Sequence, residues 1–485
     1  MKIKLISGKI LIIVLLLLIF ADTVYSFLQH YSVSLDGDMP TIIVPSEPFK
    51  TVLKDPFGFN VVVHDSVYSA TNRFFAHWSM RGYFRTMPFV FQKITSPVNS
   101  VYLSCALAKT IIQVLIIYLL AVYITGKTKI FNKDFLLAVV IVTPLFQAFG
   151  YSGQMGIIDK TLTYTWFYAF PLALVMLFFL PFFLKDYHLK FHNLKIIHIV
   201  LLVLLAVVLS FNGPLNAPVV LIISFLVFIR NYLLNFSQDE EKSLFKKLLL
   251  TFQDTLKKYP WIYIIACIVC IYSLYIGLNN NDIISQNIPL TERYARLTKG
   301  FNQFVQKPGP PLLLLIIIIN ILLVYRHKSN PEAQKMLKLL KWFGIFALIY
   351  ILLLPLGGYK YYRPGIIRRD TIMPVFIGLF FFYGISSFFL IKNLAAKYKA
   401  IYITAIVAFL LLFTFADTTD FKHNTCERRA LETLAASGEK IVVLKEDCTV
   451  MSWNKFSQHG YSYEIAELLK FWGILEEKKG FCWEY

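Results

Sequence analysis

Two aspartates flank one glycine in the string Asp36-Gly37-Asp38, at the start of a long segment between two apolar runs. Carboxylates two residues apart around a glycine can turn toward one site, where one accepts a proton from a hydroxyl and both bind a divalent cation. The candidate ion is Mg²⁺ or Mn²⁺, with Asp36 and Asp38 as ligands. An Asp-Gly string also favours a tight turn whatever the function, so the pattern leaves both interpretations open.

A third acid, Asp159, lies just before another apolar run. A carboxylate at this position could complete a metal or acceptor site, so Asp159 is a candidate second acidic site. The commoner explanation is a helix N-terminus, where the helix dipole favours a negative side chain.

Four basic residues interleave with tyrosines in the short segment 357–370. They are Lys360, Arg363, Arg368 and Arg369. Arginine can bind a phosphate through two parallel hydrogen bonds, so the segment is a candidate phosphate site. Anionic lipid headgroups in general would satisfy the same charges.

Residues 66–85 predict an aromatic-rich helix in the membrane interface, capped at its first residue or at Asp65. Arg73, His77 and Arg81 recur every four residues and so share one stripe of that helix. The stripe either contacts lipid headgroups or forms a cationic wall for a lipid-linked phosphate, with Arg73 and Arg81 as its ligands.

The elements that must position these side chains are membrane helices. Of the 485 residues, 57% are hydrophobic and 16% are charged, whereas an average soluble chain is about 25% charged. This composition excludes an ordinary soluble protein. Spanning a bilayer takes roughly 20 apolar residues, and eleven apolar runs predict an all-α polytopic protein with about eleven transmembrane helices. The runs are 10–28, 101–125, 135–150, 162–184, 196–212, 214–229, 261–278, 311–325, 342–358, 374–391 and 400–415.

The distribution of lysine and arginine tests this division through the positive-inside rule. With a cytoplasmic N-terminus, the predicted cytoplasmic segments hold 23 of the 48 Lys and Arg residues and a net charge of +16, against +3 for the outside segments. The formal charge of +19 therefore reports orientation and requires no nucleic-acid partner. We expect the C-terminus outside, and a first helix that is retained rather than cleaved as a signal peptide.

The predicted topology gives four parts. They are the first transmembrane helix (1–28), the first periplasmic loop with juxtamembrane helices (29–100), transmembrane helices 2–11 (101–415) and a periplasmic C-terminal domain (416–485). The last part mixes a strand-like run, 440–445, with a helix-like run, 461–472, which predicts a small α/β domain.

Three cysteines, Cys426, Cys448 and Cys482, belong to this C-terminal part. An oxidising compartment would permit one disulfide, most simply Cys426–Cys448. The third cysteine leaves the pairing open.

An acidic pair right after the first helix, about ten further helices and an outside C-terminal domain resemble the GT-C superfamily of integral-membrane glycosyltransferases. In that family an acid near the start of the first outside loop is the general base, and Asp36-Gly37-Asp38 matches this motif. An acid in the second outside loop often helps to bind metal or acceptor, which corresponds to Asp159. Late basic residues bind the phosphate of a polyprenyl-phosphate sugar, a role that Lys360, Arg363, Arg368 and Arg369 match by location.

The resemblance implies a GT-C-like fold and transfer of a sugar, with inversion, from a polyprenyl-phosphate donor to a glycan or lipid acceptor. The one N-x-[ST] sequon, at Asn235, lies in a predicted cytoplasmic loop, which together with the Lys- and Ile-rich composition favours a bacterial inner membrane. A Walker sequence and a dinucleotide-binding fingerprint are both missing from the sequence, which agrees with a donor that carries no nucleotide.

Two other functions compete with this interpretation. An O-antigen polymerase or ligase would use outside arginines and histidines without an acid, and the stripe of Arg73, His77 and Arg81 fits it. A transporter or flippase for lipid-linked glycans is less favoured, because such folds are commonly built from repeats and we find none.

Overall fold

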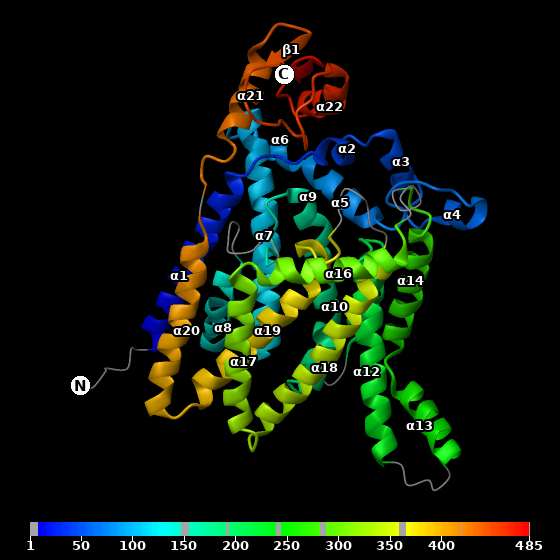
Figure 1. The fold of residues 1–485 in the computed structure, drawn as a ribbon, viewed down its shortest axis with the longest axis vertical. Coiled ribbons are helices and arrows are strands. Elements are labelled where there is room, and N and C mark those ends of the chain that lie inside the picture. The colour runs from blue at the N-terminus through cyan, green and yellow to red at the C-terminus, as the bar shows by residue number, and fades with distance from the viewer. Residues whose placement is uncertain are drawn as a thin grey trace.

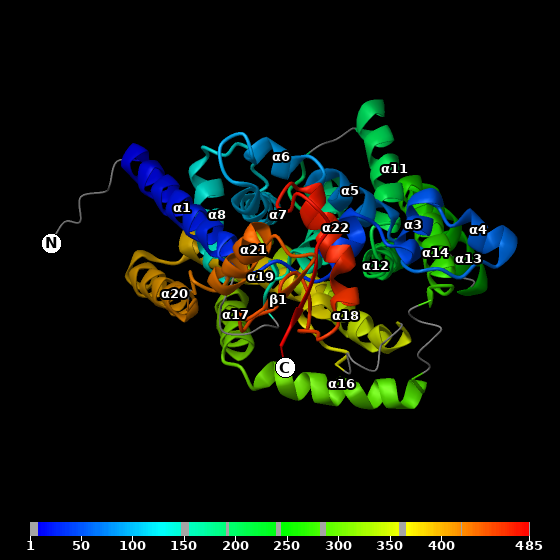
Figure 2. The same cartoon turned by 90° about the horizontal axis from the view of Figure 1, so that it is seen from above.

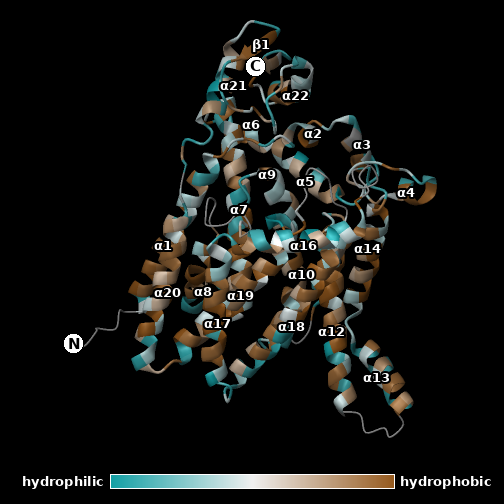
Figure 3. Cartoon of the chain, viewed as in Figure 1, coloured by the Kyte–Doolittle hydropathy of each residue, from teal (hydrophilic) through white to brown (hydrophobic). Residues whose placement is uncertain are grey.

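The computed structural model describes residues 8–146, 155–190, 194–238, 244–281, 288–357, 365–418 and 420–484. A bundle of apolar helices fills most of the molecule, and a small domain containing the C-terminus caps one end (Figure 1). The hydrophobic residues concentrate in the long helices of the bundle (Figure 3). We call the end that carries this domain the capped end.

Eight helices among the described residues are long and apolar enough to cross a membrane, which makes this a multi-pass membrane protein. Seven of them are regular: α1 (Gly8–Tyr31), α7 (Pro97–Thr125), α12 (Asn216–Gln238), α17 (Gly309–Arg326), α18 (Pro331–Leu353, followed by a 3₁₀ turn at Leu354–Leu356), α19 (Arg369–Asn393) and α20 (Ala396–Ala416). The eighth joins α9 (Leu162–Tyr164), the π-helical turn η2 (Thr165–Ala169) and α10 (Phe170–Asp186).

Three of the eleven predicted runs form shorter helices: α8 (Lys133–Val142, with η1 at Thr143–Leu145), α11 (Ile196–Ser210) and α14 (Trp261–Gly277). At 1.5 Å per residue the ten residues of α8 reach only about 15 Å, half of a bilayer core. Pro144 explains why α8 ends, because proline has no N–H to continue the helix. Helix α14 meets α13 (Leu244–Lys258) at a bend of 91°, and counting this pair as one crossing gives up to nine spans.

The connections alternate between the two ends of the bundle. The turns that join α17 to α18 and α19 to α20 lie opposite the capped end, and α1 also begins there (Figure 1). Helix α16 (Leu290–Val305) instead lies across the bundle and follows one edge of it when seen from the capped end (Figure 2).

Five short helices cover the capped end between α1 and α7: α2 (Met39–Ile43), α3 (Glu47–Lys54), α4 (Phe59–His64), α5 (Phe74–Phe84) and α6 (Met87–Phe91). The predicted helix over 66–85 was wrong in its first half, because α5 begins only at Phe74. Asp65 ends α4 instead of capping α5. Ala70 has φ 63°, a left-handed conformation that interrupts any right-handed helix before Phe74.

The C-terminal domain consists of α21 (Thr425–Ala436), β1 (Ile441–Leu444), η4 (His459–Ser462), α22 (Tyr463–Phe471) and β2 (Gly480–Trp483). The two strands pair in parallel, with Ile441 opposite Gly480, and α22 supplies the crossover that parallel strands require. The predicted strand, the predicted helix and the Cys426–Cys448 disulfide are confirmed.

Glu427 joins this domain to the bundle. Its buried carboxylate accepts hydrogen bonds from Leu35 N–H (2.8 Å), Tyr102 O–H (2.8 Å) and Met451 N–H (3.1 Å). The neighbouring Arg428 guanidinium lies 3.8 Å from the centre of the Tyr102 ring. One carboxylate therefore connects the C-terminal domain, the segment after α1 and helix α7.

We expect Glu427→Gln to weaken the attachment of the C-terminal domain. Glutamine turns an N–H toward one of three donors, and an unsatisfied buried donor costs about 1–3 kcal/mol. Burial also raises the pKa of Glu427 to about 7 from an ordinary 4.5, so the wild-type contact should weaken as the pH rises through that interval. The glutamine variant should lose most of this pH dependence.

Limited proteolysis of the detergent-solubilised protein measures this effect as the rate at which the C-terminal domain is released. Glu467→Gln is the matched control, because Glu467 is exposed and pairs with Lys478 at the surface. Equal release from the Glu427 and Glu467 variants would contradict the role assigned to Glu427.

Candidate functional site

Asp36 is buried at the capped end, just after α1, with 5% of its surface exposed. Thr163 holds both of its oxygens: the Thr163 N–H donates to Oδ2 (2.8 Å) and the Thr163 hydroxyl to Oδ1 (2.6 Å). The Asp38 N–H also donates to Oδ1 (3.1 Å). Burial raises the pKa of Asp36 to about 6, although the bonds from Thr163 act in the opposite direction. This carboxyl group therefore changes charge close to neutral pH.

The segment that carries Thr163 has an unusual backbone. It runs from Asp159 through the short α9 into the π-helical turn η2 before α10 becomes regular. Asp159 folds the segment on itself, because its Oδ1 accepts from Thr161 N–H (2.8 Å) and its carbonyl accepts from the Thr165 hydroxyl (3.2 Å). Single π-helical turns are rare and are frequent at functional sites. Thr163 lies in α9, two residues before this turn begins.

Asp159 forms an ion pair with Arg369, the first residue of α19. Only 2% of the Asp159 side chain is exposed, whereas 36% of the Arg369 side chain reaches the surface. Burial raises the pKa of Asp159, although Arg369 and Lys109 attract its negative charge. Lys109, from α7, donates to the carbonyl of Lys160.

Two aspartates and two cations from four distant segments thus gather at one place. Lys109 interacts electrostatically with Asp36, Asp159 and Arg369. Asp36 is bonded to Thr163, four residues after Asp159. The sequence predicted both aspartates and Arg369 as site residues, and the structure brings them together.

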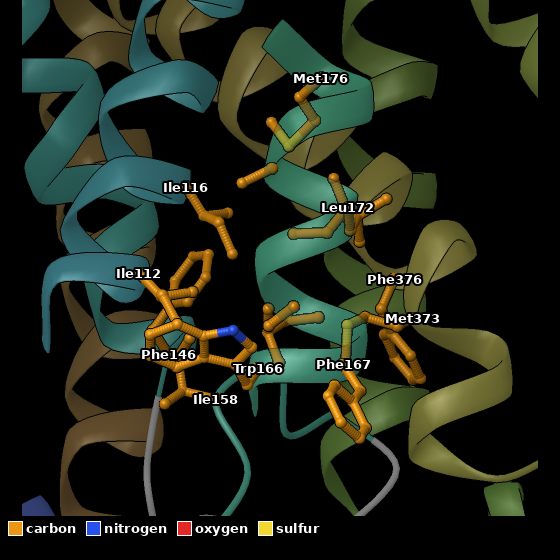
Figure 4. Close-up of a cluster of buried hydrophobic side chains, with 14 of the residues drawn as sticks. Ile112, Ile116, Phe146, Ile158, Trp166, Phe167, Leu172, Met176, Met373 and Phe376 are labelled. Atoms are coloured by element: carbon orange, nitrogen blue, oxygen red, sulfur yellow. The ribbon is translucent and has the colours of Figure 1, made fainter. Parts of the chain in front are cut away.

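An apolar cluster lies next to this charged group. Side chains of α7, α10 and α19 surround Trp166 and Phe167 of the π-helical turn (Figure 4). Ile158, in the same cluster, immediately precedes Asp159. Surroundings of this kind contain little water, which strengthens the interactions between the neighbouring charges.

Asp38 faces a different partner. Its Oδ1 accepts from the indole N–H of Trp453 in the C-terminal domain (2.9 Å). Trp453 also packs so closely on Gly37 that a Cβ there would lie 2.9 Å from the Trp453 ring. The two predicted catalytic carboxylates therefore have separate partners, with Asp36 bonded within the bundle and Asp38 bonded to the C-terminal domain.

The other predicted phosphate ligands differ in their hydrogen-bond and ion-pair partners. Arg368 binds Asp370 through two bonds, Nε to Oδ1 (3.0 Å) and Nη2 to Oδ2 (2.9 Å), which offset its charge. Lys360 and Arg363 lie outside the described residues. Arg73 precedes α5 and Arg81 lies within it, and the Nε of each is buried without a hydrogen-bond partner in the part of the chain that the structure describes.

His77 does not share the role predicted for the Arg73/Arg81 stripe. Its ring packs on those of Phe49 and Phe167, with centroids 5.1 and 5.0 Å away. Burial lowers the pKa of His77 to about 3, so the ring is neutral at ordinary pH. His77 packs α5 against the π-helical turn.

Several side chains of the site were missed as site residues from the sequence. Lys109 carried a signal, because a lysine inside an apolar run is costly and often functional. Thr163 carried none, since threonines are common in such segments. Trp453 is 415 residues from Asp38 in the chain, and no local pattern connects the two.

The residues around Asp36 fit a divalent cation poorly. Mg²⁺ prefers near-octahedral coordination by oxygen ligands, several of which are often waters. Here the oxygens of Asp36 already accept three hydrogen bonds, and Asp159 is paired with Arg369. Within the described ranges no group of three or more His, Cys, Asp or Glu residues could hold a metal ion.

Comparison with known proteins identifies no family for this chain. The sequence matches no family model, and it matches no curated protein. Any function must therefore be argued from the chemistry of the site.

We expect Asp159 and Arg369 to be strongly coupled in stability. Asp159→Asn removes the paired carboxylate of Arg369 and one of the two aspartates that attract Lys109. Breaking a fully buried pair costs about 3–5 kcal/mol, and the cost here is smaller because 36% of the Arg369 side chain is exposed. The double variant Asp159→Asn/Arg369→Gln should lose less stability than the sum of the two single variants.

Thermal unfolding of the detergent-solubilised single and double variants measures this coupling. The exposed pair Glu467–Lys478 serves as the control, and its coupling free energy should be about 0–1 kcal/mol. Additive effects at Asp159 and Arg369 would show that the ion pair does not stabilise the site.

Proposed function

We propose that this protein is a membrane glycosyltransferase that moves a hexosyl or pentosyl group from a polyprenyl-phosphate donor to a glycan or lipid acceptor at the capped end. One observation supports it above the others: Thr163 bonds Asp36 to the segment whose Asp159 is paired with Arg369. A base for the acceptor and cations for the leaving phosphate would then share one site.

The proposed location is a bacterial inner membrane, with the N-terminus cytoplasmic and the capped end periplasmic. Support comes from the excess of lysine and arginine in the predicted cytoplasmic segments, whose described parts lie opposite the capped end. The protein would act in assembly of the cell envelope.

In the proposed reaction an acceptor hydroxyl attacks the anomeric carbon of the donor sugar. The hydroxyl proton passes to Asp36 as the new carbon–oxygen bond forms. The bond from the anomeric carbon to the phosphate oxygen breaks, and its electron pair stays on the polyprenyl phosphate. Arg369 and Lys109 stabilise the negative charge on that leaving group, because preorganised charges act strongly in a dry site.

Other side chains have supporting roles in this proposal. Asp159 positions Arg369, and Thr163 positions Asp36 through two hydrogen bonds. A pKa of about 6 suits Asp36 as a base, because the best catalytic pKa lies near the working pH. Arg73 and Arg81 offer further donors for the phosphate where the lipid approaches along α5.

We expect Asp36→Asn to reduce transfer by about 10²–10⁴-fold, the usual contribution of a general base. Asp38→Asn should retain most of the activity, since Asp38 bonds to the C-terminal domain and not to Thr163. The assay uses membranes that contain each variant and labelled polyprenyl-phosphate sugar. Full transfer by Asp36→Asn, or loss only with Asp38→Asn, would remove Asp36 from the mechanism.

The rate should also depend on pH in a defined direction. Only ionised Asp36 accepts a proton, so the rate should rise with pH through about 6 and level off above it. Initial rates between pH 4.5 and 8, after a stability check at each pH, give the profile. A rate that stays constant or falls across this interval would contradict Asp36 as the base.

The Nε atoms of Arg73 and Arg81, which are buried and have no hydrogen-bond partner among the described residues, favour a second candidate function. An O-antigen polymerase or ligase would act on lipid-linked glycans through arginines and would not need a carboxylate. Loss of glycan transfer in Arg81→Ala and Arg369→Ala, with full activity in Asp36→Asn and Asp38→Asn, would favour this alternative.

A further inference from the structure

A pocket of about 340 Å³ opens between the segment after Asp36 and the C-terminal domain. Gly37 and Thr41 form one wall, and Trp453, Phe456, Tyr461 and Glu464 are among the residues that form the other. Its volume falls in the usual range for small-ligand sites, about 300–1,000 Å³. Helices α2 and α22 bring the two walls together (Figure 1).

The lining combines aromatic faces with hydrogen-bonding groups. Trp453 is 52% exposed and Tyr461 70% exposed, and both line the pocket. Glu464 and Thr41 supply polar groups, and the Ser452 hydroxyl has no hydrogen-bond partner among the described residues. Flat aromatic faces carry partial negative charge and attract the polarised C–H faces of a sugar ring. Hydroxyl groups at the ring edge would meet the polar side chains.

The charges of the pocket argue against a phosphate as its occupant. Lys455 is the one basic side chain in the lining, and it is paired with Asp447. Glu464 would repel an anion. A neutral, polyhydroxylated ligand matches this lining better than the phosphate of the lipid donor does.

The pocket also lies beside the proposed base. Gly37, which lines it, separates Asp36 from Asp38 in the chain. The indole N–H of Trp453 is bonded to Asp38, so the aromatic wall is fixed to this segment. Asp36 itself does not line the pocket, so a glycan stacked on Trp453 reaches it only by passing Gly37.

We propose that this pocket binds the acceptor as a neutral carbohydrate, stacked on Trp453 and Tyr461. Its assignment as the acceptor rests on the proposed function, whereas carbohydrate binding as such does not. The pocket would present one sugar hydroxyl to Asp36 while the donor phosphate binds on the side of Arg369.

Tryptophan fluorescence of the full-length protein in lipid nanodiscs tests binding directly. The probes are methyl glycosides of glucose, galactose, mannose, rhamnose and N-acetylglucosamine, each titrated separately. At least one glycoside should bind the wild type. Trp453→Ala and Tyr461→Ala should each weaken the affinity for that glycoside by about tenfold or more. Because Trp453→Ala removes the fluorescent indole, its binding is measured by saturation-transfer NMR. Trp78→Ala is the control, because Trp78 is 59% exposed on α5 and does not line the pocket.

Several outcomes would overturn the proposal. One is that none of the five glycosides binds the wild type, and another is that Trp453→Ala binds the glycoside as tightly as the wild type does. The two claims have separate readouts, because glycoside binding is measured with Trp453→Ala and sugar transfer with Asp36→Asn. If Trp453→Ala loses binding while Asp36→Asn transfers normally, the pocket stands and the proposed function fails. If Asp36→Asn loses transfer while Trp453→Ala binds normally, the proposed function stands and the pocket assignment fails.

Discussion

The structure depends on hydrogen bonds and ion pairs that stabilise buried carboxylates at the capped end of an apolar bundle. A charged group taken out of water is stable only when charges or hydrogen bonds replace its hydration. Asp36 meets this need through Thr163, and Asp159 through Arg369. Because Thr163 and Asp159 belong to one short segment, satisfying one carboxylate also fixes the place of the other.

The same principle connects the C-terminal domain to the bundle. Glu427 accepts hydrogen bonds from the domain itself, from the segment after α1 and from α7. This attachment holds Trp453 against Gly37 and Asp38. The domain is thereby placed so that its aromatic pocket opens one residue from Asp36, which gives the proposed enzyme neighbouring places for donor and acceptor.

The sequence predicted much of the fold because apolar length and charge asymmetry are local properties. The predicted helix bounds were wrong where one residue ends or interrupts a helix, as Pro144 does after α8 and Ala70 does before α5. Asp36, Asp159 and Arg369 were recognisable as charges in segments outside the apolar runs. Their convergence was not, because it depends on Thr163, a residue with no distinctive pattern.

A structure of the protein with bound polyprenyl phosphate tests the central claim most directly. We expect the phosphate to contact Arg369 and to leave room for one sugar ring between itself and the Asp36 carboxylate. If the phosphate lies more than about 15 Å from Asp36, for example on Arg73 and Arg81 alone, a hydroxyl within hydrogen-bond reach of Asp36 could not also contact the anomeric carbon. That result would contradict a single site for base and leaving group.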